Sequence, residues 1–199
     1  MPTWLALIGA YLIGSLDFAV VVAQAKGVDI RSVGSGNPGT SNVLRTLGRG
    51  PAAMVLVGDS LKGVIAAAVG WLAAGTGGDP ALEPLAYAAG FLAVAGHAFP
   101  VFHRFKGGKG VATAAGVMFF TVPLVALVIG VVWASIAKIW KVASIASLVS
   151  LGLAIPGALL VGVRGDALIW LAAMLVLIVA RHRPNIQRML SGSEERVPT

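Results

Sequence analysis

Three polar segments of this chain carry residue types that bind anions, and each lies beside a long apolar run. The first is "GSGNPGTSNVLRTLG", residues 34–48. Its glycines at 34, 36 and 39 permit positive φ angles, and successive N–H groups in such turns form anion-binding nests. We expect Thr40, Ser41 or Asn42 to cap a short helix that ends at Gly48, and its N-terminus would favour an anion. Arg45, about one turn into that helix, could bind a phosphate with two hydrogen bonds. The alternative is a flexible loop with a capped surface helix.

The second segment, "GHAFPVFHRFKGGKG", ends in two lysines separated by glycines, Lys106 and Lys109. It is not a Walker loop, because Lys109 is followed by glycine, and His103 stands where the first glycine would be. Glycine N–H groups beside lysine at a helix start still offer donors and positive charge to an oxyanion. A positive-inside anchor would explain the lysines, but not three glycines that each cost about 1 kcal/mol in a helix. His97, in the preceding apolar run, is expected to be a structural histidine, with a direct role as the alternative.

The third segment, "ARHRPNIQRMLSGSEERV", places His182 and Asn185 three positions apart. The two share a face if the helix continues across Pro184. Histidine is the natural acid–base group near neutral pH, and asparagine can orient a carbonyl or a hydroxyl. Ser144 and Ser147 in "KVASIAS" either face the site or hydrogen-bond between helices, and the sequence leaves both open.

Three further polar residues lie in or beside apolar runs. Asp59 and Lys62 are three positions apart. We expect them to pair, because a lone charge inside an apolar helix is costly. Asp17 has no evident partner in the sequence.

The elements that must position these segments are long apolar helices. Hydrophobic residues make up 57% of the 199 residues and charged residues only 12%, against about 25% charged in typical soluble domains. A hydrocarbon core of about 30 Å needs about 20 helical residues, so the apolar runs predict transmembrane helices. The first run lacks a basic flank and a small-residue cleavage site, so we expect it to be retained. The runs are residues 3–25, 51–74, 81–102, 111–137, 142–163 and 167–180.

The run 111–137 decides the predicted topology. Pro123 lies near its middle, where proline removes a backbone donor and disfavours helix in the preceding residue. A hairpin broken around residues 121–123 places 13 of the 15 Lys and Arg residues on one side of the membrane, whereas a single span scatters them. We therefore predict one domain, residues 1–199, that is an all-α polytopic integral membrane helical bundle. It has about seven transmembrane helices, two of them short, with the N-terminus outside and the C-terminus cytoplasmic. Five spans plus a re-entrant pair fit the pattern equally well.

The charge and cysteine content exclude several functions. The net charge is +7, but the bases lie in short segments between apolar runs, so we expect anionic lipids or anionic substrates rather than nucleic acid. The chain has no cysteine, which excludes disulfides, thiol nucleophiles and thiolate metal sites.

Together the three segments resemble the bacterial membrane glycerol-3-phosphate acyltransferases that use an acyl phosphate as donor. The family pattern GSGN-x-G-x-T-N-x-x-R matches residues 34–45, with Ser41 in place of threonine. KGGKG is unchanged at residues 106–110, and H-x-x-N-I-x-R followed by G-x-E matches residues 182–188 and 192–194. The runs "DSLKG" and "SIAS", at residues 59–63 and 144–147, also look like family positions, so the similarity extends along essentially the whole chain. Asp17 departs from the family, where proline is usual, and bears on the local packing of the first helix.

The resemblance implies transfer of an acyl group from acyl phosphate to the 1-hydroxyl of sn-glycerol 3-phosphate, giving lysophosphatidate and phosphate in phospholipid synthesis. It implies direct transfer without a covalent acyl-enzyme, without a metal and without a cofactor. It also implies a monomer among the lipids of the bacterial inner membrane, with the active site facing the cytoplasm. The implied substrate-binding residues are Ser35, Gly36, Asn37, Gly39, Ser41, Asn42, Arg45, Lys106, Gly107, Gly108, Lys109 and Gly110, and the implied catalytic residues are His182, Asn185, Ser144 and Ser147. The sequence leaves open whether His182 or the leaving phosphate takes the proton, and which lysine meets which phosphate.

The main alternative is a membrane transporter of phosphate or sugar-phosphate anions. Its site would lie near the midplane between repeated halves, but the chain shows no internal repeat and its glycine motifs gather on one predicted face. An acyltransferase of the H-x-x-x-x-D type is disfavoured, since no histidine has an aspartate five residues later. A metal phosphohydrolase is disfavoured because the carboxylate cluster that divalent ions require is missing.

Overall fold

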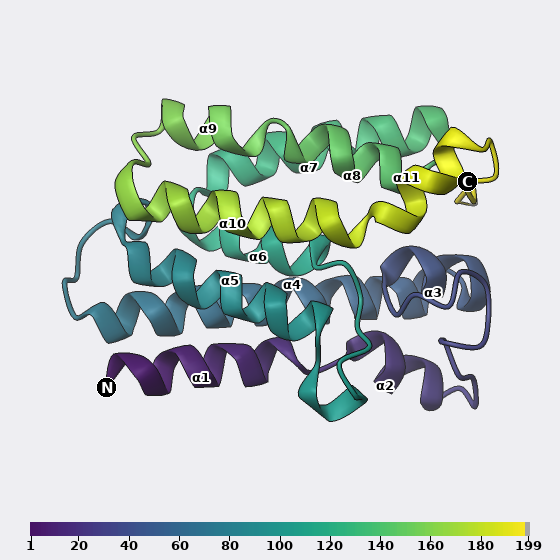
Figure 1. Ribbon diagram of the computed structural model, residues 1–199, viewed down its shortest axis with the longest axis horizontal. Coiled ribbons are helices and arrows are strands. Elements are labelled where there is room, and N and C mark those ends of the chain that lie inside the picture. The colour runs from purple at the N-terminus through teal and green to yellow at the C-terminus, as the bar shows by residue number, and fades with distance from the viewer. Residues whose placement is uncertain (198–199) are drawn as a thin grey trace.

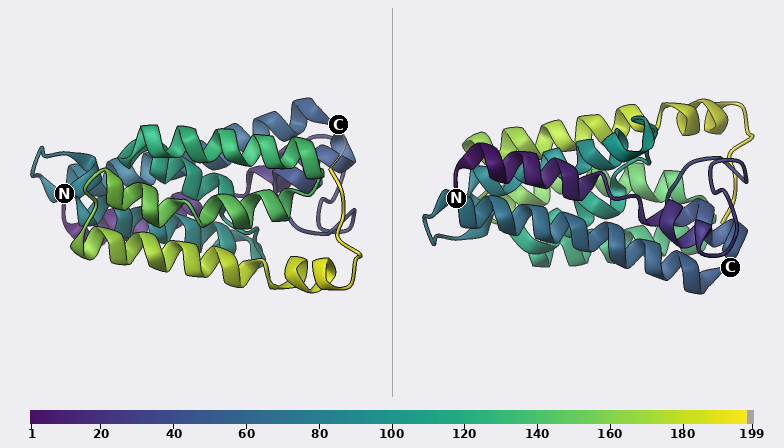
Figure 2. Two further views of the ribbon diagram at one scale, coloured as in Figure 1. Left: turned by 90° about the horizontal axis from the view of Figure 1, so that it is seen from above. Right: turned by 90° about the horizontal axis from the view of Figure 1, so that it is seen from below.

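The computed structural model describes residues 1–197, and these fold into helices joined by turns and loops, without any β-strand. Most of the long helices run side by side, with the N-terminus at one end of the bundle and α11 at the other (Figures 1 and 2). The α-helices are α1 (Thr3–Gly14), α2 (Phe18–Gln24), α3 (Thr40–Leu47), α4 (Arg49–Ala74), α5 (Pro84–Ala98), α6 (Val111–Thr121), α7 (Pro123–Trp140), α8 (Ala143–Leu151), α9 (Ala154–Leu160), α10 (Gly165–Arg181) and α11 (Arg183–Leu190), with 3₁₀ turns η1 (Pro80–Leu82) and η2 (Val101–His103).

The all-helical membrane fold predicted from the sequence is confirmed. Five segments are long and apolar enough to cross a bilayer: Thr3–Gln24, Arg49–Ala74, Pro84–His103, Pro123–Trp140 and Ala143–Leu160. A sixth is the pair α10 and α11, whose axes are bent by 50°, and α6 is a shorter apolar helix. The number of helices that cross the bilayer, and the side on which each terminus lies, stay predictions.

The predicted break in the apolar run 111–137 is present. Helix α6 ends at Thr121, Val122 is non-helical with φ −137° and ψ 65°, and Pro123 is the first residue of α7. Proline suits that position because the first helical residue has no intrahelical N–H bond to lose. With 11 residues, α6 is about 16 Å long and reaches only part of the way through a hydrocarbon core. It begins on the side of the bundle where α3 and α11 lie, and α7 runs back toward that side (Figure 1).

Close contact between α4 and α6 depends on glycine. A Cβ added at Gly63 would overlap the carbonyl oxygen of Thr113, and one added at Gly116 would overlap that of Ser60. Small residues let membrane helices approach closely where no water is available to drive association. This contact fixes the start of α6, and with it the segment that leads into α6.

Asp17 has a partner that the sequence did not reveal. Its Oδ1 accepts a hydrogen bond from the Val20 N–H at 3.2 Å and caps α2, while its Oδ2 lies 3.0 Å from Nη2 of Arg31. Asp17 had no evident partner in the sequence because Arg31 lies beyond the end of α2, where helical spacing does not predict contacts. Inside the bundle, Lys62 and Asp59 pair at 2.8 Å as predicted.

The three polar segments meet at one end of the bundle. Helix α3, the turn before α6, and α11 with residues 191–197 lie toward the end of the bundle opposite the N-terminus (Figures 1 and 2). The Val197 N–H donates to the Lys141 carbonyl oxygen at 2.7 Å, which ties the C-terminal segment to the end of α7.

Candidate active site

One cavity of about 480 Å³ connects the three polar segments to the apolar interior. Its polar end is lined from α3, from the turn before α6, from the junction of α10 and α11, and from the C-terminal segment. Its apolar part lies against α6, α7 and α8. The lining includes Ser35, Asn37, Gly39, Thr40, Ser41, Asn42, Arg45, Asp59, His97, Lys109, Gly110, Ser144, Ser147, His182, Glu194 and Glu195 at polar positions, and Val111, Ala115, Met118, Ala126, Ile129, Gly130 and Trp133 among the apolar ones. Such a shape suits a molecule with an anionic head and a long hydrocarbon chain.

The segment before α3 turns through glycines and is held by Asn42. Gly34 and Gly36 have φ values of 56° and 67°, as expected, whereas Gly39 is extended with φ −167° and requires no glycine for its conformation. Asn42 Oδ1 accepts from the Ser35 N–H at 3.1 Å, and its Nδ2 donates to the carbonyl oxygens of Ile30 and Val33.

The predicted capping of α3 is wrong. The N-cap residue is Gly39, and among the described residues no side chain bonds to the first N–H groups of α3. The side chain of Asn42 is engaged with the preceding loop, so it is not available as a cap. The Asn42 N–H donates to the Gly39 carbonyl oxygen at 3.1 Å, so the N–H groups of Thr40 and Ser41 are the ones that remain available to an anion in the cavity. The helix ends at Leu47, before Gly48, as predicted.

Arg45 reaches the cavity from the second turn of α3. Its Nη2 lies 3.4 Å from Ser35 Oγ and 2.7 Å from Glu195 Oε2 in the C-terminal segment. The side chain of Arg45 is 20% exposed and that of Glu195 is 37% exposed. A carboxylate of this chain therefore occupies the position on Arg45 that a phosphate oxygen would need.

The KGGKG turn is packed rather than flexible. A Cβ at Gly107 would overlap the His97 carbonyl oxygen, and one at Gly108 would overlap the His97 ring. The Gly108 N–H donates to the His97 carbonyl oxygen at 3.1 Å. Arg181 donates to the carbonyl oxygens of Gly107 and Gly108 at 2.8 and 3.1 Å. Close packing against α5 thus explains why glycine is required at both central positions. Arg181 supplies the hydrogen-bond donors for their carbonyl oxygens.

The two lysines of this turn differ in their surroundings. Lys109 lines the cavity, whereas Lys106 is exposed to the outside and does not line it. Burial lowers the pKa of the Lys109 ammonium to about 8, an effect that Glu194 opposes and Arg188 reinforces. A partly desolvated ammonium of this kind interacts strongly with an anion that enters the cavity.

His182 stands at the bend between α10 and α11. It is 1% exposed, yet its ring lines the cavity. Nδ1 lies 2.8 Å from the Ile178 carbonyl oxygen. Because a carbonyl only accepts, Nδ1 must carry the proton, and Nε2 of the neutral ring is then left as an acceptor.

Glu194 organises the residues around His182. Its Oε1 accepts from Ser144 Oγ at 2.7 Å and from Asn185 Nδ2, and its Oε2 accepts from Arg188 Nε at 2.8 Å. Burial raises the pKa of the Glu194 carboxyl, but these three hydrogen bonds outweigh burial and leave the pKa below its ordinary value. Glu194 is therefore a carboxylate at neutral pH, held in place on three sides.

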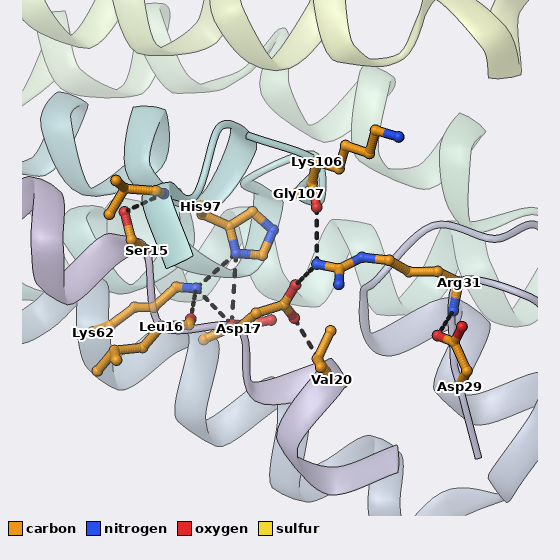
Figure 3. A network of polar contacts seen from close by, with 12 residues as sticks. Ser15, Leu16, Asp17, Val20, Asp29, Arg31, Lys62, His97, Lys106 and Gly107 are labelled. Atoms are coloured by element: carbon orange, nitrogen blue, oxygen red, sulfur yellow. Dashed lines mark hydrogen bonds and ion pairs between the residues drawn. The ribbon is translucent and has the colours of Figure 1, made fainter. Parts of the chain in front are cut away.

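A buried charge cluster borders the cavity through Asp59 and His97. Lys62 Nζ lies 2.8 Å from Asp59 Oδ1, 2.7 Å from His97 Nδ1 and 2.8 Å from the Leu16 carbonyl oxygen (Figure 3). The ammonium donates, so Nδ1 of His97 accepts. His97 is hydrogen-bonded, as expected of a structural histidine, and its ring also lines the cavity.

The structure brings most of the predicted site residues together. Those that line the cavity are Ser35, Asn37, Gly39, Ser41, Asn42, Arg45, Lys109, Gly110, Ser144, Ser147 and His182. Gly36, Lys106, Gly107, Gly108 and Asn185 do not line it. Asn185 lies behind Glu194, and Ser147 donates to the Ala143 carbonyl oxygen while accepting from Trp133 Nε1 at 3.0 Å.

Sequence reasoning missed four charged residues of the site region: Arg31, Arg181, Glu194 and Glu195. The G-x-E pattern at residues 192–194 was a signal for Glu194. The other three gave no signal, because their partners lie far away along the chain. Within the described residues, no group of three or more His, Asp or Glu side chains is placed to hold a metal ion.

Comparisons with known proteins agree on one family. A family model described as glycerol-3-phosphate acyltransferase matches residues 4–192. Proteins named glycerol-3-phosphate acyltransferase from Burkholderia pseudomallei and Cupriavidus taiwanensis are each 45% identical to this chain and cover 99% of it, with 96% and 97% of their own lengths covered. The crystal structure of PlsY, an integral membrane glycerol 3-phosphate acyltransferase, is similar in its glycerol 3-phosphate form with a TM-score of 0.90 and 40% identity, covering 99% of this chain and 96% of that one. Its lysophosphatidic acid form has a TM-score of 0.87 and 39% identity, covering 98% of this chain and 94% of that one.

Proposed function

The chain belongs to the glycerol-3-phosphate acyltransferase family, and on that premise we propose that it transfers an acyl group from an acyl phosphate to the 1-hydroxyl of glycerol 3-phosphate. The products are lysophosphatidate and inorganic phosphate. The protein is an integral membrane acyltransferase that acylates glycerol 3-phosphate in phospholipid synthesis. The acyl phosphate donor, the direct transfer and the residue roles given below are parts of the proposal.

The observation that carries the proposal is the single cavity that joins an anion-binding end to an apolar channel. Both proposed substrates carry phosphate, and one carries a hydrocarbon chain. The N-terminus of α3, Arg45 and Lys109 supply N–H donors and positive charge at one end. The acyl chain then lies against α6, α7 and α8, where Met118 and Trp133 contribute apolar surface.

The chemistry requires positioning more than activation. Acyl phosphate is already activated, since phosphate is a good leaving group, so the acceptor hydroxyl can attack the carbonyl carbon directly. The new ester bond forms as the bond between the acyl carbon and the phosphate oxygen breaks. Holding both reactants in line can account for about 7–11 kcal/mol of the barrier. The ammonium of Lys109 and the N–H groups at the start of α3 stabilise the negative charge that develops on oxygen.

We assign His182 the role of orienting the acceptor hydroxyl through Nε2. A buried imidazole close to the Lys109 ammonium is a poor site for a second positive charge. The proton of the hydroxyl therefore does not stay on the His182 ring but ends on the departing phosphate. Asn185 acts through Glu194, which it holds beside Ser144.

The proposed setting is the bacterial inner membrane, with the cavity on the cytoplasmic side. The bundle end that bears the three polar segments carries most of the Lys and Arg residues, which favours that side by the positive-inside rule. We propose that the protein acts as a monomer, since the polar segments of one chain already converge on a common cavity.

Purified protein supplied with acyl phosphate and glycerol 3-phosphate should release phosphate and form lysophosphatidate in equal amounts, with a chelator present. His182→Ala should lower kcat about 100-fold or more, as loss of a group that positions a reactant does. The matched control is His103→Ala, which alters a histidine that does not line the cavity. Flux of glycerol 3-phosphate across proteoliposomes without any acylated product would refute the acyl transfer and select the transporter.

A further inference from the structure

The break between α1 and α2 is connected to the KGGKG turn by charged side chains. Asp17, in the break, pairs with Arg31, and the same Nη2 of Arg31 donates to the Lys106 carbonyl oxygen at 2.9 Å (Figure 3). The Leu16 carbonyl oxygen accepts from Lys62 on α4. The break is therefore anchored to α4 on one side and holds the turn before α6 on the other.

The turn is consequently held by two arginines. Arg31 bonds to the carbonyl oxygen of Lys106, and Arg181 bonds to those of Gly107 and Gly108. Three consecutive carbonyl groups are thus fixed from the connection between α2 and α3 and from the end of α10. Lys109 follows at once and reaches into the cavity.

Lys109 depends on such restraints because of the two glycines before it. Glycine has more accessible backbone conformations than any other residue, so an unrestrained Lys106–Gly108 segment could take many paths. An ammonium that must sit in a partly desolvated position is then sensitive to small shifts of its own backbone. Neither Asp17 nor Arg31 lines the cavity, so any effect they have on substrate passes through the turn.

We propose that Asp17 and Arg31 are positioning residues for Lys109, which hold the KGGKG turn so that the ammonium points into the cavity. The proposal rests on the proposed function only in treating Lys109 as the phosphate-binding lysine. Asp17 fixes the guanidinium of Arg31, and Arg31 fixes the Lys106 carbonyl. Arg31 is 28% exposed and Asp17 only 6%, so the carboxylate is the rigid end of this connection.

The test measures how the reactivity of the Lys109 amino group depends on pH. Competitive labelling with trace acetic anhydride between pH 6 and pH 11, with mass spectrometry of the peptide that contains Lys109, gives the pH midpoint of its reactivity. The midpoint of the parent protein should lie near the pKa of about 8 that burial produces. Releasing the turn lets water reach the ammonium, so the midpoint should rise by about one unit or more toward the ordinary lysine value.

Other charged groups act on Lys109 and must stay in place during the comparison. Glu194, Arg188, Arg45 and Glu195 influence it electrostatically. His182, His97 and Asp59 line the same cavity. None of these residues is altered in the variants below, so a shift of the midpoint reports movement of the turn.

Two variants test the charge of Asp17 apart from its helix cap, and the hydrogen bond that Arg31 donates to the Lys106 carbonyl oxygen. Asp17→Asn removes the charge, while asparagine still caps a helix about as well as aspartate. Arg31→Gln removes the donor to the Lys106 carbonyl. The matched control is Arg164→Gln, because Arg164 also donates to two backbone carbonyl oxygens, those of Leu159 and Val163, at the opposite end of the bundle.

We expect Arg31→Gln and Asp17→Asn to raise the labelling midpoint and Arg164→Gln to leave it unchanged. In the acyl-transfer assay, the first two should raise KM for at least one phosphate-bearing substrate by about three- to tenfold, the loss of one ordinary hydrogen bond, with a smaller change in kcat. An unchanged midpoint in both variants would overturn the proposal, as would equal effects in Arg164→Gln. A parent protein that forms no lysophosphatidate would refute the proposed function, while the labelling profile would still decide the positioning role.

Discussion

If Arg45 binds a substrate phosphate as proposed, Glu195 must compete with that phosphate for Arg45. Removing the Glu195 charge should then strengthen substrate binding. The carboxylate lies 2.7 Å from Arg45 Nη2, and both groups line the cavity. A phosphate that is to bind Arg45 must first displace Glu195. The free energy of the existing ion pair is therefore subtracted from the affinity for the phosphate.

The exposure of the pair sets the size of this effect. Arg45 is 20% and Glu195 37% exposed, so water and salt screen the interaction, and pairs of this kind contribute about 0.2–1 kcal/mol. Glu195→Gln removes the charge and keeps the shape of the side chain. We expect KM for the phosphate-bearing substrate at Arg45 to fall by about 1.4- to fivefold, since 1.4 kcal/mol corresponds to a factor of ten.

Steady-state kinetics with each substrate varied in turn measure the effect. kcat should change little, because the ion pair is already broken when substrate is bound. The advantage of Glu195→Gln should shrink in about 1 M salt, where charges are screened within about 3 Å. Asp166→Asn at the far end of the bundle removes the same charge from the protein and should leave KM unchanged. A rise in KM for both substrates in Glu195→Gln would refute the reasoning, because Glu195 would then support binding rather than compete with it.

Two further predictions follow from the site and from helix packing. Burial lowers the pKa of Lys109 to about 8, so its side chain is charged below that pH and neutral above it, and kcat/KM should fall about tenfold between pH 7 and pH 9. Lys109→Arg, whatever its absolute activity, should have no such fall. A parent profile that stays flat over this range would contradict the role of the ammonium. Gly116→Ala places a Cβ on the Ser60 carbonyl oxygen, whereas Gly130→Ala meets nothing within 4 Å. Gly116→Ala should cost about 1–3 kcal/mol of stability and lower the unfolding temperature in detergent, and Gly130→Ala should leave it nearly unchanged; equal unfolding temperatures would show that α4 and α6 can move apart freely.

Local sequence determined the helices and the place where the long apolar run breaks. Backbone groups in a bilayer must be satisfied within the segment, so a long apolar run can only be a helix. Pro123 cannot continue the helix that precedes it, because it has no N–H and restricts Val122. These effects act between neighbours in the chain, which is why the hairpin of α6 and α7 could be predicted without knowledge of the partners of either helix.

The convergence of the three motifs was predicted from charge, and the structure places them around one cavity. The roles of single residues within the motifs were harder to predict. Gly107 and Gly108 looked like anion ligands but are packed against His97, and Asn185 contacts Glu194 rather than the cavity. A glycine required for close approach and a glycine required for a phosphate nest look the same in a sequence.

The sequence by itself determined that this chain is a bundle of membrane helices with anion-binding segments at one end, because hydrophobic length and helix breakers act locally. Only the tertiary structure decided that Lys109 rather than Lys106 enters the cavity, that Glu195 occupies Arg45, and that Asp17 reaches the KGGKG turn through Arg31. These contacts join residues on different helices. The distances between these residues depend on how closely small residues let the helices pack. Spacing along the chain does not predict that packing.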